Sequence, residues 1–156
     1  MSRWSHVAGV IRIDALPLHS NCDVEWVAEV EKNLGKIVLF NSPRRLWDLP
    51  ITEKTPMGSE GGIQYTINLT GNKNSLTRGT ITIFADLRDF GSLKDTKTIL
   101  SWLNNAFEKI KSCYIRQAII QVEDEGKEGN GFIIWDDDKG FIFYPTSPTT
   151  SETQSS

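Results

Sequence analysis

The chain has 156 residues, the length of one ordinary domain, which is enough to bury a core of its own. Its formal net charge of -3 argues against a protein that holds nucleic acid mainly through a basic face. No apolar run is long enough to span a membrane and the amino terminus does not resemble a signal peptide, so we expect a cytoplasmic protein without membrane contact.

The amino-terminal stretch is predicted to be a strand over residues 3–14, because its side chains alternate between two faces. A helix should follow, since apolar residues recur at helical spacing from Val27 to Leu34 and Gly35 is placed to end it. A long connection over residues 41–62 then carries three prolines.

A hairpin is the clearest element, with alternating strands over residues 63–69 and 79–87. A further strand is predicted over residues 114–123. A second hairpin should turn at residues 136–140, where three aspartates precede a lysine and a glycine.

The most secure helix lies between the first hairpin and the strand over residues 114–123. Ser92 and Asp95 have the spacing of a capping box, in which each side chain bonds the other residue's backbone N–H. The helix then carries an apolar stripe made of Ile99, Leu103, Phe107 and Ile110.

This order of elements predicts an α+β fold of the ferredoxin-like, split βαβ type: an antiparallel sheet with both helices on one face, plus an added C-terminal hairpin. We expect a single domain over residues 1–144 and a disordered tail over residues 145–156, where Ser, Thr and Pro replace apolar residues. The other sheet face should be open, presenting His6, Arg12, Gln64, Thr66, Asn68, Thr80, Thr82, Phe84, Asp86 and Arg88.

Three stretches, "WSHVAGVIRID", "GSEGG" and "TIFADLRDFG", resemble a family of small uncharacterised accessory proteins encoded by tailed phages of Gram-positive bacteria. The resemblance covers most of residues 3–125. It implies action inside a bacterial host, where such proteins often block a defence by binding a protein, a nucleic acid or a nucleotide signal. It implies no particular chemistry.

The glycine loop, residues 58–62, has two interpretations. Its backbone N–H groups could bind a phosphate, with Ser59 and Gly61 as candidate contacts, or its glycines could simply permit the turn into the next strand. Glu60 would repel an anion, which favours the turn. At the end of the first hairpin, Arg88 could bind an anion through its guanidinium group or pair with a neighbouring carboxylate.

The long connection contains Arg44, Arg45 and Trp47, a combination typical of interaction hot spots and of base-stacking sites. Alternatively, Trp47 could fold back and cover the edge of the hydrophobic core, and this interpretation is equally supported. Because the glycine loop begins one hairpin strand and Arg88 ends the other, we expect Ser59, Gly61 and Arg88 to lie close together. With the loop residues, they form the candidate binding edge.

A metal-dependent enzyme would use Asp14 with Asp136, Asp137 and Asp138, but the aspartate run is better explained as a turn. His6 and His19 have no catalytic partner at a defensible spacing, and we expect neither a cofactor nor a metal. Cys22 and Cys113 lie far apart, which favours free thiols.

The sequence therefore favours a non-catalytic binding protein that neutralises a host factor, with a host protein or a small anionic nucleotide ligand as its target. An RNA-binding module on the open sheet face is an alternative, weakened by the acidic charge and by Phe84 being the only aromatic residue placed on the central hairpin. The metal-dependent enzyme is the third. The same open face would also suit a homo-oligomer interface.

Overall fold

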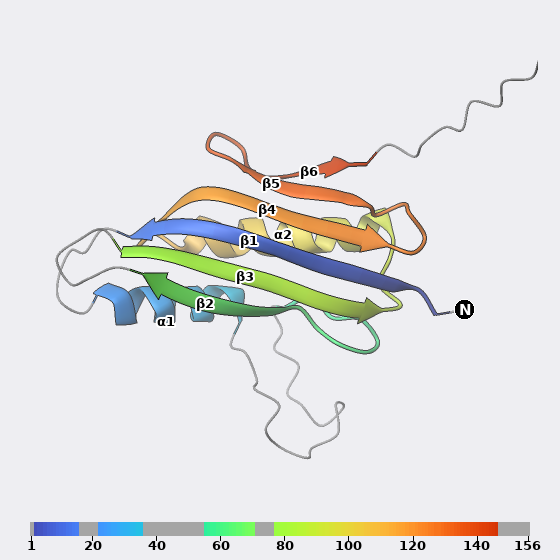
Figure 1. The fold of residues 1–156 in the computed structure, drawn as a ribbon, viewed down its shortest axis with the longest axis horizontal. Coiled ribbons are helices and arrows are strands. Elements are labelled where there is room, and N and C mark those ends of the chain that lie inside the picture. Colours follow the sequence, from blue (N-terminus) through green and yellow to red (C-terminus); the bar gives the residue numbers. More distant parts are fainter. Residues whose placement is uncertain (1, 16–21, 36–54, 71–76, 147–156) are drawn as a thin grey trace, which may run out of the picture.

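The computed structural model describes residues 2–15, 22–35, 55–70 and 77–146, and these form six strands and two helices (Figure 1). The predictions for His19, for the long connection up to residue 54 and for the tail from residue 147 lie outside this part of the chain. The elements are β1 (Trp4–Ala15), α1 (Cys22–Leu34), β2 (Gln64–Thr70), β3 (Thr77–Arg88), α2 (Leu93–Lys109), β4 (Tyr114–Asp124), β5 (Gly131–Asp136) and β6 (Gly140–Pro145).

All six strands belong to one antiparallel sheet, so the predicted α+β class, antiparallel sheet and two helices are confirmed. The strand order is β2-β3-β1-β4-β5-β6, and the C-terminal hairpin therefore widens the sheet beside β4. The order of the whole sheet differs from that of a four-stranded split plan. The fold also reaches beyond residue 144, because β6 ends at Pro145 and Thr146 N donates to the carbonyl oxygen of Asn130 at 3.0 Å.

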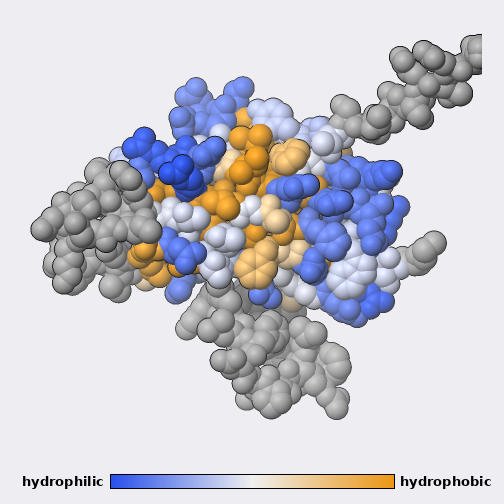
Figure 2. Space-filling view, viewed as in Figure 1, coloured by the Kyte–Doolittle hydropathy of each residue, from blue (hydrophilic) through white to orange (hydrophobic). Residues whose placement is uncertain are grey.

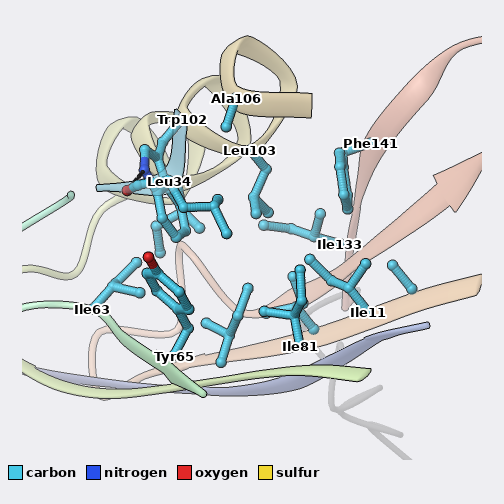
Figure 3. Packing of buried hydrophobic residues seen from close by; sticks show 14 of the residues in the cluster. Ile11, Leu34, Ile63, Tyr65, Ile81, Trp102, Leu103, Ala106, Ile133 and Phe141 are labelled. Carbon is cyan, nitrogen blue, oxygen red and sulfur yellow. Dashed lines mark hydrogen bonds between the residues drawn. The ribbon is translucent and has the colours of Figure 1, made fainter. Parts of the chain in front are cut away.

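Helix α2 forms where the sequence places its capping box, with the side chain of Ser92 accepting from Asp95 N and that of Asp95 accepting from Ser92 N. Its apolar stripe packs against the sheet (Figure 3). Helix α1 covers the same face, and Trp102 Nε1 of α2 donates to the carbonyl oxygen of Leu34 in α1 at 3.0 Å. The shared core includes Ile11, Trp26, Val30, Leu34, Tyr65, Ile81, Ile83, Ile99, Leu103, Phe107, Ile110, Ile120 and Ile133.

Tyr65 links β2 to the helical layer. Its ring is buried in the core (Figure 3). Its hydroxyl donates a hydrogen bond to the carbonyl oxygen of Gly35, just after α1. Burial raises the pKa of this hydroxyl to about 12, and the negative charge of Glu31 adds to the shift.

In the described part of the chain, no helix lies on the opposite sheet face, as Figure 1 shows. Every residue expected on this open face is exposed or half-buried. The residues that alternate with them along β1, β2 and β3 point to the other side of the sheet. Apolar side chains gather at the centre of the face between hydrophilic regions (Figure 2). The open face is therefore the side of the sheet that neither α1 nor α2 covers.

Candidate functional site on the open sheet face

The glycine loop, residues 58–62, precedes β2 and forms backbone hydrogen bonds with the end of β3. Ser59 N donates to the carbonyl oxygen of Arg88 at 2.8 Å, and Arg88 N donates to the carbonyl oxygen of Glu60 at 3.1 Å. The loop is thus tied by its backbone to the last residue of β3, and the structure brings Ser59, Gly61 and Arg88 together.

The backbone at position 61 requires a glycine. Its φ is 80°, in the left-handed region, and a Cβ there would lie 2.5 Å from the carbonyl oxygen of Asp86. The close approach of the loop to β3 explains this residue without a ligand, which supports the turn interpretation of the sequence.

The side chains at this edge are already paired. Arg88 forms an ion pair with Glu60 and donates from Nη2 to Ser2 Oγ at 2.7 Å. Ser59 Oγ donates to Asp89 Oδ2 at 2.6 Å. The guanidinium charge of Arg88 therefore faces a carboxylate of its own chain rather than an open anion site.

The other members of the candidate binding edge, Arg44, Arg45 and Trp47, lie outside the described residues. The edge as a whole stays a prediction, of which the structure describes only the part formed by the glycine loop and the end of β3.

A second polar pair lies next to this edge on the open face. His6 on β1 faces Asp86 on β3, with Nδ1 2.5 Å from Oδ1, and both side chains are exposed. Sequence reasoning placed both residues on this face but found no partner for His6. The β1–β3 register, which sets the two residues opposite each other, was the missing information.

These residues line a shallow hollow of about 370 Å³. Its polar groups are an imidazole, a carboxylate and the amide of Gln64, and the ring of Phe84, 43% exposed, lies beside them. An aromatic face next to a carboxylate suits a cationic or hydrogen-bond-donating group. The full lining is His6, Val7, Ala8, Gly61, Gly62, Gln64, Phe84, Ala85 and Asp86.

An apolar band crosses the sheet beside the hollow. Ile119 of β4 and Ile134 of β5 are directly paired and are 48% and 37% exposed. Val10 of β1 pairs with Ile119, and Ile142 of β6 pairs with Ile134, so one rung carries four apolar side chains across four strands. A continuous apolar patch with exposed side chains at its centre is typical of an interaction surface.

Apart from Arg88, whose charge faces Glu60, charge is divided between the two ends of the open face. At one end, His6 lies between Asp86 on β3 and Glu123 on β4, and we call these three residues the acidic rim. At the other end of β1, Arg12 is exposed and has no ion pair or hydrogen bond within the described ranges. The apolar band separates the two.

The carboxylates of the metal hypothesis have other partners. Asp14 is buried and forms an ion pair with Arg116, which occupies a bulge of β4 where the β1–β4 register shifts. Asp136 Oδ1 accepts from the backbone N–H groups of the turn, and Asp137 Oδ1 accepts from Trp135 Nε1 at 2.9 Å. Among the described residues, no three His, Cys, Asp or Glu side chains are grouped to hold a metal ion.

A second hollow of about 340 Å³ lies where α2 ends, between Phe107, Tyr114 and Trp135. Cys113 lines it as a free thiol. Burial raises the pKa of this thiol, a contact with the indole of Trp26 opposes the shift, and the charge of Glu29 adds to it.

No helix in the described ranges is long and apolar enough to cross a membrane. The chain matches no protein-family model, no curated protein and no solved structure among those compared.

Proposed function

We propose that this chain is a non-catalytic, protein-binding protein whose docking surface is the open sheet face. The observation that carries the proposal is the apolar band of Val10, Ile119, Ile134 and Ile142, whose two central residues Ile119 and Ile134 are exposed. The band lies beside a polar hollow and is not covered by either helix. An apolar centre with a polar rim is the usual composition of a protein interface.

The hollow supports recognition of a basic group. Asp86 and Glu123 supply negative charge, and the exposed ring of Phe84 offers a cation–π contact beside them. A lysine or arginine side chain of a protein partner would meet both features while neighbouring apolar residues cover the band. The imidazole, carboxylate and amide of the hollow act in this proposal as hydrogen-bonding groups.

This charge distribution gives less support to the other targets considered. A small anionic ligand would meet Asp86 in the hollow, and at the glycine loop it would compete with Glu60 for Arg88. RNA gains some support, because Phe84, Phe132 and Tyr144 share one rung of the open face and aromatic rings can stack bases. The acidic rim would nevertheless repel the phosphate backbone.

The resemblance to phage accessory proteins supplies a context for this proposal: a host protein, bound in the bacterial cytoplasm to weaken a defence. In this proposal the described part of the candidate binding edge, formed by the glycine loop and the end of β3, is a second contact region adjoining the hollow. Arg44, Arg45 and Trp47 stay predicted members of that edge. For the fold, we propose that β1 to β4 and both helices are a ferredoxin-like unit extended by β5 and β6. The position of β3 between β1 and β2 supports that relationship.

The proposal can be tested by placing a photo-crosslinking phenylalanine analogue at position 84 and, as a control, at Lys97 on the exposed side of α2. On irradiation in cells, position 84 should form a covalent adduct with a protein and position 97 should not. The adduct should disappear when Ile119 is also changed to Asp. Equal adducts at both positions, or none at position 84, would contradict the proposal.

A further inference from the structure

We infer that, in the absence of a host protein, the open face is covered by a second copy of this chain, with Arg12 of each copy lying against the acidic rim of the other. The inference rests on the proposed function, because it names the occupant of the same docking surface. It is carried by the separation of charge: Arg12, which has no ion pair with any described residue, lies at one end of β1, and two carboxylates flank His6 at the other.

The outward-facing residues of β1 define the geometry. They are His6, Ala8, Val10 and Arg12, which mark four evenly spaced rungs along the strand. The midpoint lies between Ala8 and Val10. The acidic rim and Arg12 are therefore equally far from the centre of the face, on opposite sides of it.

A symmetric dimer that packs these two faces together has a two-fold axis in the plane of the interface. The axis can run across the strands or parallel to them, and the charges favour the first direction. An axis running across the strands, between the Ala8 and Val10 rungs, exchanges the two ends of the face. Arg12 then lies over His6 of the second copy, between Asp86 and Glu123. An axis parallel to the strands would instead place one acidic rim on the other, which like charges disfavour.

The same axis brings the apolar residues together. Each strand then lies over the same strand of the second copy. Val10 lies over Ala8 and Ile134 over Phe132, whereas Ile119 lies over Gln121. The two sheets would pack face to face with strands aligned to within about 30°, the usual arrangement of packed antiparallel sheets. The apolar centre is covered on both copies and each charged contact occurs twice.

Sedimentation velocity and native mass spectrometry test this arrangement in the purified full chain. The wild type should dimerise, and Arg12→Glu and Glu123→Arg should each weaken the dimer by about tenfold or more, because each change makes two repulsive contacts. An equimolar mixture of the two variants should recover a dimer of mixed mass. Lys97→Glu, an equal change of charge on exposed α2, should leave the dimer intact.

A monomeric wild type, an unaffected Arg12→Glu dimer, or a mixture that fails to recover would overturn the inference. Circular dichroism must show that the variants are folded, which the exposure of both side chains favours. The crosslink at position 84 separates the two proposals. An adduct with a different protein from a monomeric wild type overturns only the inference, whereas no adduct of any kind overturns both.

Discussion

Ile119 and Ile120 are neighbours on β4 that point to opposite sheet faces, one 48% exposed and the other fully buried. The two residues therefore represent the two faces of the sheet, the core face and the open face. Ile120 belongs to the core under the helices, whereas Ile119 belongs to the apolar band of the open face.

Truncation of each residue should therefore have a different consequence. Ile120→Ala should lower the free energy of unfolding by about 2–5 kcal/mol, because it removes buried atoms and leaves a cavity. Ile119→Ala should change it by less than about 1 kcal/mol, since the side chain is largely in solvent, and should weaken association on the open face. Urea unfolding with sedimentation velocity measures both. An association defect confined to Ile120→Ala would contradict the assignment.

The glycine loop yields a second prediction. Gly61→Ala should cost about 1–3 kcal/mol of stability, because an L-residue is strained at a φ of 80° and its Cβ would press on the carbonyl oxygen of Asp86. Gly62→Ala is the matched control. Its Cβ would press on the flexible side chain of Met57 at 3.2 Å and would meet the backbone oxygen of Pro56 only at an ordinary contact distance of 3.8 Å, so its cost should be smaller.

If the loop has only this structural role, Gly61→Ala should lose association in proportion to the fraction unfolded. A folded Gly61→Ala protein with normal unfolding behaviour and no binding would instead indicate that the loop contacts a ligand. Thermal unfolding and the position-84 crosslink, measured on the same preparation, distinguish these results.

The local elements could be predicted from the sequence because their signals are local. The alternation of β2 and β3, the Ser92–Asp95 capping box and the stripe on α2 each lie within a few consecutive residues, and all three are confirmed. Contacts between distant segments were harder. The His6–Asp86 pair depends on the register of β1 with β3.

The bulge of β4 shows the same limit more clearly. Arg116 reaches Asp14 only because one extra residue shifts the β1–β4 register, and alternation alone cannot locate such an insertion. The sequence also did not indicate that the last hairpin pairs with β4. The apolar rung from Val10 to Ile142 could therefore not be predicted. The candidate docking surface depends on both.

The thiol of Cys113 provides a third prediction. Because burial raises its pKa, the thiolate fraction at pH 8 is small, and alkylation by iodoacetamide should be several-fold slower in the folded protein than in urea. Peptide mass spectrometry over time measures the rate at this residue. Equal rates in the two conditions would show that the Cys113 thiol is exposed and that its pKa is not raised.

The raised pKa of Tyr65 predicts how stability changes at alkaline pH. The folded protein holds this proton up to about pH 12, whereas the unfolded chain releases it near pH 10. Between these values the unfolded state binds fewer protons, so this group lowers the unfolding free energy by about 1.4 kcal/mol per pH unit. Tyr65→Phe should cost about 1 kcal/mol at pH 8, where it removes the hydrogen bond to Gly35, yet lose stability less steeply above pH 10. Urea unfolding of both proteins at pH 8, 10 and 11 gives the two slopes. Parallel declines would mean that Tyr65 ionises alike in both states, and the buried hydroxyl would then not be the source of the alkaline sensitivity.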